Sequence, residues 1–396
     1  MTRINWPEVS LMDICHPKQW PTISAQDLTP SGFPVFGANG KIGFYTEYNH
    51  EEPTILITCR GATCGVVNIS EPKSYVTGNA MALDDLNTQS ADLRFVYHAL
   101  VARGFRDAIT GTAQPQITRD SLRRVSFRLP PVPEQRRIAD ILDKADAIRR
   151  KRKQAIAVTD QLLRSTFLEM FGDPVTNPKG WPVATIGELC ESGGNIVDGP
   201  FGSSLKPEHY TSSGVRVIRN WNIRDDFFDE SDFRYIDLVK FEEIRRSEVV
   251  PEDILITTKG TVGDICMMPP LAGDSVLSAS GTVRFRLPPN RVLLAPFVVW
   301  QMVLPRYKQY LHSFEAGSAQ QYLNLSALRK MRLIIPPAVH QQRFCDLRLR
   351  VIGIKQKQET AQLDASSLFT SLADRAFRGQ LTRVGQAAGQ LSMFNK

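Results

Sequence analysis

The sequence predicts an α+β fold in which two globular domains are joined by two long helices that form an antiparallel coiled coil. Three observations lead to this prediction. The chain of 396 residues contains an internal repeat, with its matching segments in the same order in both copies. The front of each copy mixes short strand-type runs with turn residues. The back of each copy shows sustained heptad spacing of apolar residues, and the duplication implies a pseudo-twofold relation between the copies.

The repeat fixes the order of the parts. Trp6-Pro7 recurs 175 residues later, and the run Ile55–Thr58 recurs 199 residues later. The block from Gly111 to Gln135 recurs 206 residues later, and this register then holds as far as Phe171. Because the offset only rises, the second copy carries 31 additional residues, all of them before Gly317. Each copy therefore has a front of variable length and a back of fixed length.

The front of each copy is predicted to be a compact α+β domain rather than a wound βαβ sheet. Strand-type runs include Thr54–Thr58, Val66–Ile69, Val215–Ile218 and Val283–Leu287. A helix-type stretch lies near the end of each front, at Leu93–Ile109 and Pro296–Leu311. A Pro-Pro step then precedes the long helical segment in both copies, which suits the place of proline at a helix start.

The back of each copy is predicted to be one long helix with an apolar stripe. The first stripe is formed by Ile138, Ile141, Ala145, Ile148, Ala155, Leu162 and Thr166, and the second by Phe344, Leu347, Val351, Ile354, Ala361, Leu368 and Leu372. A helix from Pro133 to Phe171 would be about 58 Å long. Each helix could fold back on its own domain, but the equal lengths and the shared polar break at Arg152 and Gln358 favour pairing of the two helices.

The composition favours a polyanionic partner. The formal net charge is +7 and the sequence pI is about 9.1. No run of about 20 apolar residues or secretory signal is apparent, so a cytoplasmic protein without membrane contact is expected. The six cysteines form no CxxC pair and the six histidines are scattered. The sequence therefore predicts buried thiols rather than a zinc site.

Catalytic motifs are missing from the sequence. The segment Gly37–Ile42 has the wrong spacing for a phosphate-binding loop, and no GxSxG or HExxH motif occurs. Phe314–Gly317 only faintly matches a motif for S-adenosylmethionine and lies inside the repeated block. The acids Glu252 and Asp253 have no counterpart in the first copy, which argues against a nuclease site. We therefore expect no catalytic site in this chain.

Several motifs resemble one known family, the specificity subunits of type I restriction–modification enzymes. The run Leu129-Pro-Pro-x-x-Glu-Gln-x-x-Ile-Ala139, which continues to Leu142 and Asp146, resembles the entry to the central helix of that family. Phe167–Asp173, followed by Trp181, resembles its passage into the second recognition domain, and Gly199–Ser203 and Ile254–Gly263 are similar to parts of its recognition domains. The resemblance covers the chain from Trp6 to Leu381.

The second helix entry departs from the first. His340 stands where the first copy has Glu134, and Phe344-Cys345 stands where the first copy has Ile138-Ala139. The resemblance therefore implies that contacts with a partner subunit differ between the two halves.

The resemblance implies a division of the chain into five parts. These are α/β target recognition domains at 1–132 and 173–338, a central spacer helix at 133–172, a distal spacer helix at 339–381 and a flexible tail at 382–396. Each recognition domain would read one half of a split, asymmetric site in double-stranded DNA, and the helices would set the distance between the halves. A spacer of about 58 Å corresponds to roughly 17 base pairs.

The resemblance also implies partners that supply the chemistry. Two methyltransferase subunits would dock on the helices, bind S-adenosylmethionine and flip an adenine in each half-site. Restriction subunits that use ATP with magnesium and translocate DNA would join in a restricting enzyme. This chain itself would bind no cofactor and no metal.

Base recognition requires side chains with paired donors and acceptors, such as arginine for guanine and asparagine or glutamine for adenine. The candidate DNA contacts in the first domain are Asn39, Lys41, Arg60, Asn79, Gln114, Gln116 and Arg119. Those in the second domain are Ser203, Lys206, Arg219, Asn220, Asn222, Lys259, Gln320 and Gln321. Arg60 and Lys259 are equivalent in the repeat, which suits a phosphate contact common to both domains. The basic run Arg149–Lys153 is expected to be a solvated helix face, because residues 355–359 are far less basic.

Two other functions fit the same architecture. One is a non-catalytic scaffold in which the coiled coil carries two protein-binding heads. The other is the recognition module of a different defence complex with another effector.

Overall fold

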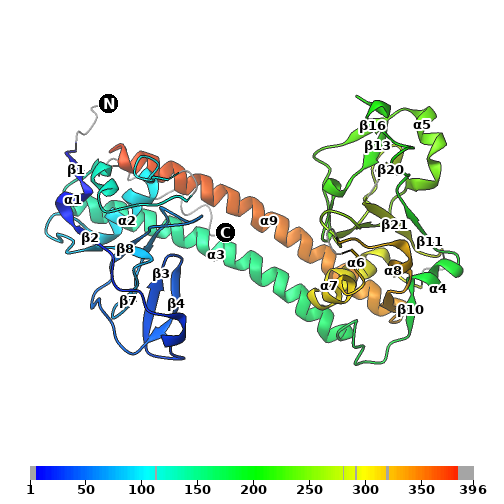
Figure 1. The fold of residues 1–396 in the computed structure, drawn as a ribbon, viewed down its shortest axis with the longest axis horizontal. Helices are drawn as coiled ribbons and strands as arrows, with labels where there is room; N and C mark the ends of the chain where they lie inside the picture. The colour runs from blue at the N-terminus through cyan, green and yellow to red at the C-terminus, as the bar shows by residue number, and fades with distance from the viewer. Residues whose placement is uncertain (1–5, 112–113, 280, 290–291, 318–320, 382–396) are drawn as a thin grey trace. The chain divides into compact units, whose positions relative to one another are not determined.

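The computed structural model describes residues 6–111, 114–279, 281–289, 292–317 and 321–381 (Figure 1). The chain forms two compact units: residues 1–155 with 358–396 make unit 1, and residues 156–357 make unit 2. The two long helices, α3 (Val132–Phe171) and α9 (Ala338–Phe377), contribute residues to both units. The predicted flexible tail, 382–396, lies outside the described residues.

Unit 1 contains three small sheets. The two-stranded sheet pairs β1 (Glu8–Ser10) with β9 (Ser126–Arg128). The four-stranded antiparallel sheet has the order β2 (His16–Lys18), β8 (Ala80–Asp84), β5 (Ile55–Thr58) and β6 (Val67–Ile69). The three-stranded sheet has the order β4 (Gly40–Tyr45), β3 (Phe33–Gly37) and β7 (Tyr75–Val76). The short helices are α1 (Leu11–Ile14), α2 (Leu93–Arg103) and the 3-10 turns Ala25–Asp27 and Ser121–Arg124.

Unit 2 has the same plan with added elements. A two-stranded sheet pairs β10 (Val183–Thr185) with β22 (Arg332–Ile334), and a hairpin pairs β14 (Ile223–Arg224) with β15 (Phe227–Phe228). The four-stranded sheet has the order β11 (Asn195–Asp198), β21 (Thr282–Arg286), β18 (Ile254–Thr257) and β19 (Ile265–Met267). The five-stranded sheet has the order β12 (Tyr210–Thr211), β16 (Arg234–Ile236), β13 (Val215–Ile218), β20 (Ser275–Leu277) and β17 (Glu248–Val249). Its helices are α4 (Ile186–Glu191), α5 (Leu238–Glu243), α6 (Ala295–Val303), α7 (Pro305–His312) and α8 (Leu325–Arg329), with 3-10 turns at Pro207–His209, Asn220–Asn222 and Arg245–Ser247.

The strand orders reproduce the repeat seen in the sequence. The order β2-β8-β5-β6 in unit 1 corresponds to β11-β21-β18-β19 in unit 2, and β1-β9 corresponds to β10-β22. Each unit also has one mixed sheet with one parallel pair, β3 with β7 in unit 1 and β13 with β20 in unit 2. Two domains of mixed α and β structure and two long helices confirm the predicted fold class. The sequence repeat includes two of these strand pairs, because β5 and β18 are the run that recurs after 199 residues, and β9 and β22 lie in the block that recurs after 206 residues.

The Pro-Pro-x-x-x-Gln entry of each long helix is a hydrogen-bonded joint. The fully buried amide of Gln135 accepts from the Asp92 N–H at 2.7 Å and donates to the carbonyls of Ser90 and Pro130, both at 2.7 Å. In unit 2, Gln341 accepts from the Leu294 N–H at 2.9 Å and donates to the carbonyls of Val292 and Pro336. One glutamine thus attaches the long helix to the domain in each copy.

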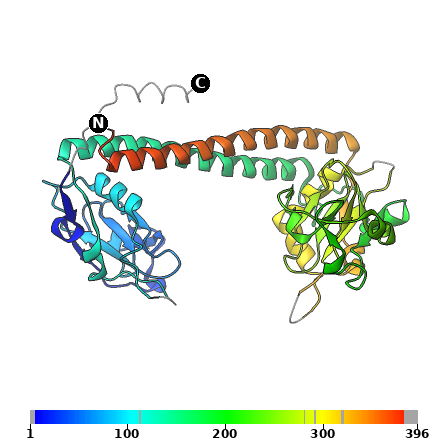
Figure 2. The same ribbon diagram turned by 90° about the horizontal axis from the view of Figure 1, so that it is seen from above.

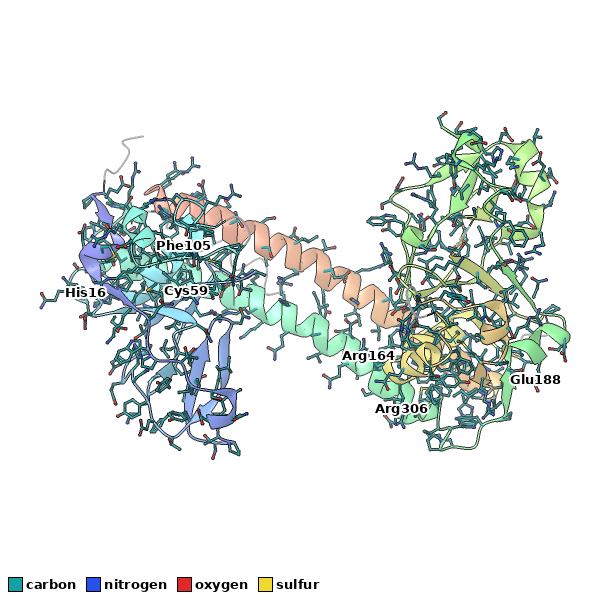
Figure 3. All side chains as sticks on the ribbon, viewed as in Figure 1. His16, Cys59, Phe105, Arg164, Glu188 and Arg306 are labelled. Carbon is teal, nitrogen blue, oxygen red and sulfur yellow. The ribbon has the colours of Figure 1, made fainter. Side chains whose placement is uncertain are left out.

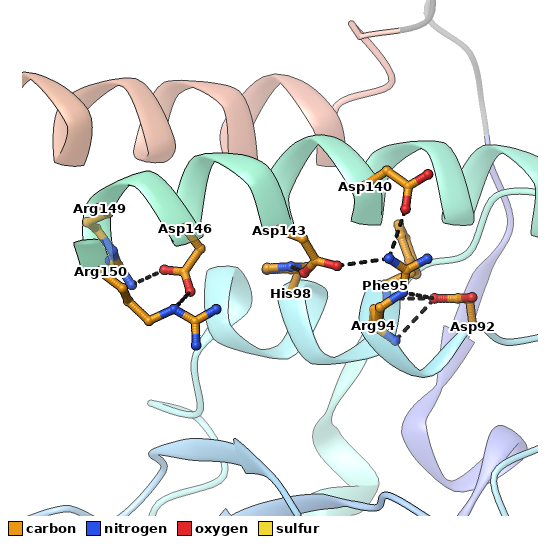
Figure 4. A network of polar contacts seen from close by, with 9 residues as sticks. All are labelled: Asp92, Arg94, Phe95, His98, Asp140, Asp143, Asp146, Arg149 and Arg150. Carbon is orange, nitrogen blue, oxygen red and sulfur yellow. Dashed lines mark hydrogen bonds and ion pairs between the residues drawn. The ribbon is translucent and has the colours of Figure 1, made fainter. Parts of the chain in front are cut away.

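A polar network adds to this attachment in unit 1 (Figure 4). Arg94 on α2 bonds Asp140 at 2.8 Å and Asp143 at 3.0 Å on α3. His98, which is 3% exposed, bonds Asp143 through Nε2 at 2.7 Å. Unit 2 makes the corresponding contact with aromatic groups instead, since Trp300 of α6 packs on Phe344 of α9. The helix-to-domain contacts therefore differ between the two units.

Within each unit the two long helices pack on each other. In unit 1 the first half of α3 and the last half of α9 lie side by side (Figure 2), and Ile138 and Ala145 share one apolar cluster with Leu372. In unit 2 the end of α3 meets the start of α9, where Phe167 contacts Phe344 with ring centroids 5.1 Å apart. Each helix therefore pairs start to end with the other, as an antiparallel coiled coil requires.

The predicted stripe is wrong at two positions. Leu162 is 55% exposed and Ile354 is 51% exposed, whereas the neighbouring Leu163 is 4% exposed. An α-helix has 3.6 residues per turn, so a strict seven-residue pattern drifts around the helix over several turns. In the last turns of α3 the apolar face has therefore moved on by one residue, to Leu163, Phe167 and Phe171.

Candidate DNA interface

The first candidate site is built on the connection between β5 and β6. Arg60 follows the buried strand β5 and is itself exposed. Gly61 has φ +83°, in the left-handed region that favours glycine, so the chain turns directly after Arg60. Cys59, just before it, is fully buried near Phe105 (Figure 3). A rigid strand end thus presents a cation to solvent.

A second loop is held against this strand end. The Ile117 N–H donates to the Cys59 carbonyl at 2.9 Å, and Gln116 forms a single antiparallel bridge with Arg60. Thr110 and Gln116 exchange two hydrogen bonds of 2.8 Å that close the loop between them. The exposed side chains of Arg60 and Gln116 are therefore fixed next to each other in backbone register.

The turn between β3 and β4 completes this group. Asn39 accepts a hydrogen bond of 2.7 Å from the hydroxyl of Thr63, and the Thr58 hydroxyl donates to the Ala38 carbonyl. Three segments far apart in sequence, around residues 39, 60 and 116, thus meet at one end of the four-stranded sheet. Asn79 lies at the same end, because its neighbour Ala80 pairs with Thr58.

Unit 2 repeats the arrangement with different side chains. Lys259 follows β18 and precedes Gly260, which has φ +78°. The Leu323 N–H donates to the Thr258 carbonyl at 3.0 Å, and Lys259 forms a single antiparallel bridge with Tyr322. Ala316 and Tyr322 exchange two hydrogen bonds of 3.0 Å. The same backbone frame therefore pairs arginine with glutamine in unit 1 and lysine with tyrosine in unit 2.

Arg60 and Lys259, called the bridge cations below, are positively charged side chains that can bind a negatively charged ligand. Among the described residues, no carboxylate pairs with Arg60 or with Lys259. By contrast, Lys41 contacts Glu71 at 3.3 Å, Arg219 pairs with Asp232 at 2.7 Å and Lys206 lies 3.6 Å from Glu208. A cation without an internal partner can contact a phosphate without first breaking an ion pair.

The structure corrects the prediction for Asn222. Its side chain is 0% exposed, its amide donates to the carbonyls of Asp229 and Asp232, and its oxygen accepts from the Arg219 N–H. All of these bonds are internal, so Asn222 shapes the loop rather than contacting DNA. Asn220 is half-buried and donates to the Lys259 carbonyl at 2.6 Å, which ties this loop to the second site.

The remaining candidates are exposed. Gln114 and Arg119 lie in the loop and turn on either side of Gln116, and Gln321 precedes Tyr322. Ser203 lies in the loop after β11. Gln320 lies outside the described residues.

Sequence reasoning missed Tyr322 and Trp221. Tyr322 is 38% exposed and stands 206 residues after Gln116, so the repeat register could have identified it. Trp221 is 56% exposed and has no counterpart in the first copy. Only its neighbours Asn220 and Asn222 were singled out.

The buried thiols take no part in this surface. Burial raises the pKa of Cys59 to about 11 and that of Cys15 to about 12, so both are protonated near neutral pH. In the part of the chain that the structure describes, no group of three metal-binding side chains occurs, and no helix is long and apolar enough to cross a bilayer. The exposed groups at both sheet ends are hydrogen-bonding and cationic, as nucleic-acid recognition requires.

Comparisons with known proteins agree with this architecture. Residues 3–158 match the family model for the type I restriction modification DNA specificity domain. The Escherichia coli EcoprrI specificity subunit is 30% identical over 116 residues, which is 29% of this chain and 28% of that protein's length. The Escherichia coli EcoBI specificity subunit is 23% identical over 325 residues, which is 74% of this chain and 67% of that protein.

The fold is shared with a solved structure of the same type. The crystal structure of the type I restriction–modification S subunit from M. genitalium has a TM-score of 0.58 and 17% identity, and covers 95% of this chain and 97% of that one. Residues 3–158 thus match the type I restriction modification DNA specificity domain, and the whole chain resembles the specificity subunits of type I restriction–modification enzymes in sequence and fold.

Proposed function

We propose that this chain is the non-catalytic specificity subunit of a type I restriction–modification enzyme. Each unit reads one half of a bipartite, asymmetric site in double-stranded DNA. The helices α3 and α9 set the number of unread base pairs between the halves and carry the methyltransferase subunits. S-adenosylmethionine is bound by those subunits, and ATP with magnesium by restriction subunits where these join. The complex acts in the cytoplasm, and this chain holds no cofactor of its own.

The observation that carries the proposal is the pair of equivalent bridges. Arg60 with Gln116 and Lys259 with Tyr322 form the same kind of backbone bridge, each at the corresponding end of the four-stranded sheet of its unit. A cation at the first position suits a phosphate, which is common to every sequence. Glutamine can bond adenine with both amide atoms, and tyrosine cannot make that pair of bonds. A protein that reads two different half-sites needs two similar backbone arrangements that carry different side chains, and the two bridges fit this requirement.

The test is methylome sequencing of a host that expresses this chain with the neighbouring methyltransferase subunit. We expect a new motif made of two short half-sites around a fixed run of unspecified bases, which disappears when this chain is deleted. A complex that assembles and methylates no such motif would contradict the proposal and favour the scaffold function.

A pair of variants assigns the half-sites. Gln116→Ala is expected to relax the motif in one half-site and to leave the other unchanged. Gln26→Ala is the matched control, because Gln26 is also exposed in unit 1 but lies on a separate 3-10 turn. Relaxation of both half-sites, or of neither, would show that the bridge does not read a base.

A further inference from the structure

The hairpin β14–β15 in unit 2 exposes an unusual group of large side chains. Trp221 is 56% exposed and Phe227 is 60% exposed. The other four tryptophans are used inside the protein: Trp6 and Trp300 are buried, and the indole N–H groups of Trp20 and Trp181 donate to Asp84 and to the Phe171 carbonyl. An aromatic pair left in water beside a cation is the composition of a protein interaction surface.

This face is held in place before any partner binds. The Arg224 guanidinium lies 4.9 Å from the centre of the Trp221 ring and is within 3.3 Å of the Ile223 carbonyl. Arg224 and Phe227 are direct cross-strand neighbours, so they project from the same side of the hairpin. The three side chains Trp221, Arg224 and Phe227, called the hairpin face below, therefore form one surface, in which the contact between Trp221 and Arg224 reduces the conformational freedom lost on binding.

The hairpin is anchored from its other side. Ile223 and Phe228 are buried in an apolar cluster. At the turn, Asp225 accepts from the Lys308 ammonium of α7, and Asp226 forms an ion pair with Arg348 of α9, which is 8% exposed. The fold of the hairpin is thus complete without the hairpin face, so these exposed side chains are not required for stability.

The hairpin face borders the candidate DNA interface and the helix α9. Asn220, next to Trp221, donates to the carbonyl of the bridge cation Lys259. Asp226 connects the same hairpin to α9. A partner seated here would touch the domain, the long helix and the edge of the DNA interface together.

Charge decides which partner fits. Five carboxyl groups lie between residues 225 and 232, and three of them, Asp225, Asp226 and Asp232, pair with Lys308, Arg348 and Arg219. Asp229 and the exposed Glu230 have no ion-pair partner among the described residues. These two negative charges beside the aromatic side chains disfavour a phosphate backbone and favour a protein surface with basic groups around an apolar side chain.

We propose that the hairpin face is a docking site, specific to unit 2, for the methyltransferase subunit that acts on the second half-site. The inference rests on the proposed function and adds to it a partner surface on the recognition domain. The face has no counterpart in unit 1. Ser31-Gly32 recurs as Ser213-Gly214 after 182 residues and Ile55 recurs as Ile254 after 199 residues, so the second copy gains 17 residues between these matches, where the face lies. The two methyltransferase subunits therefore contact this chain unequally.

The test measures subunit stoichiometry and methylation of the two strands. The double variant Trp221→Ala and Phe227→Ala is assembled with the methyltransferase subunit and titrated under native mass spectrometry. We expect at least a tenfold higher dissociation constant for one of the two methyltransferase subunits and loss of methylation in the second half-site alone. Val239→Ala, a 73% exposed residue on α5 of the same unit, should change neither quantity.

The outcomes separate this inference from the proposed function. Unchanged binding of both methyltransferase subunits would overturn the inference and leave the specificity function intact. Normal stoichiometry with weaker binding of the second half-site would also overturn it and identify the face as a DNA contact. If the unmodified chain binds no methyltransferase subunit, the proposed function itself fails. Circular dichroism of the variant excludes unfolding as the cause of any loss.

Discussion

At the scale of single residues, neighbouring side chains of the same type differ in burial and in hydrogen bonding. Gln341 is fully buried and makes three hydrogen bonds, whereas Gln342 is exposed and bonds Asp346 at 2.8 Å. Asn220 is half-buried, and Asn222 is fully internal. Residue type and loop position are therefore not enough to identify a DNA contact.

The buried glutamine gives the first stability prediction. Gln341→Ala removes three hydrogen bonds to main-chain groups, and we expect a loss of about 2–4 kcal/mol in the free energy of unfolding. Gln342→Ala should cost less than about 0.5 kcal/mol. Urea unfolding of the purified chain compares the two, and equal losses would show that the joint is not the source of the effect.

The bridge cations predict a sequence-independent effect on DNA binding. In the assembled complex, Arg60→Ala should weaken binding to specific and unrelated DNA by similar factors and lower the slope of log K against log salt by about 1. Arg60→Lys should restore most of the slope. An effect confined to one base of the motif would mean that Arg60 reads that base instead.

The raised thiol pKa of Cys59 predicts a dependence of stability on pH. Burial raises this pKa from 9.0 to about 11, so between pH 9 and pH 11 the unfolded chain loses a proton that the folded chain keeps. This contribution to stability is complete below pH 9 and decreases as the pH rises to 11. Between pH 9 and pH 11, urea unfolding should show a shallower decline in the free energy of unfolding for Cys59→Ala than for the unmodified chain. Parallel declines would show that the pKa of Cys59 is not raised in the folded chain.

At the scale of elements, the long helices show both the value and the limit of a heptad pattern. The pattern correctly predicted the length of each helix and its pairing, because about one apolar residue per turn is enough for both. It failed at Leu162, because a small drift in helical phase exchanges neighbouring positions after several turns. Which of two adjacent leucines is buried depends on the packing partner, and the partner lies in the other helix.

Leu162 and Leu163 allow a direct test of which residue belongs to the buried face of α3. Leu163→Ala removes a buried side chain and should cost about 2–5 kcal/mol, whereas Leu162→Ala should change stability by less than about 0.5 kcal/mol. Thermal unfolding of both variants measures the difference. A larger loss for Leu162→Ala would restore the stripe that the sequence predicts.

Loops were predictable only where the repeat constrains them. Arg60 and Lys259 were identified because a buried strand precedes both and a glycine follows both. Tyr322 follows from the register of Gln116. Trp221 lies in a segment that only the second copy possesses, so no comparison within the chain could identify its exposure or its contact with Arg224.

At the scale of the whole molecule, the duplication gives one polypeptide chain two candidate DNA-binding sites, one in each unit. Each unit has its own apolar core, its own bridge and its own glutamine joint. The helices α3 and α9 are shared, since each contributes residues to both units. Under the proposed function, the two half-sites can therefore differ in sequence, and the shared helices set the number of base pairs between them.

The shared helices predict a change in spacer length. Seven residues inserted into each helix, between 155 and 156 and between 357 and 358, would lengthen both by about 10 Å. The methylome should then show the same two half-sites with roughly three more base pairs between them. Insertion into one helix alone breaks the register of the pair and should abolish methylation. An unchanged spacer in the double insertion would show that the helices do not set the distance.

The glutamine joint has a consequence for how new specificities arise. Gln135 and Gln341 grip the domains through main-chain groups, the carbonyls of Ser90 and Val292 and the N–H groups of Asp92 and Leu294. A main-chain carbonyl is present in every amino acid, and a main-chain N–H in every amino acid except proline. The joint is therefore indifferent to the side chains of the domain that it holds, so a foreign recognition domain could be grafted onto the same helix without redesigning their junction.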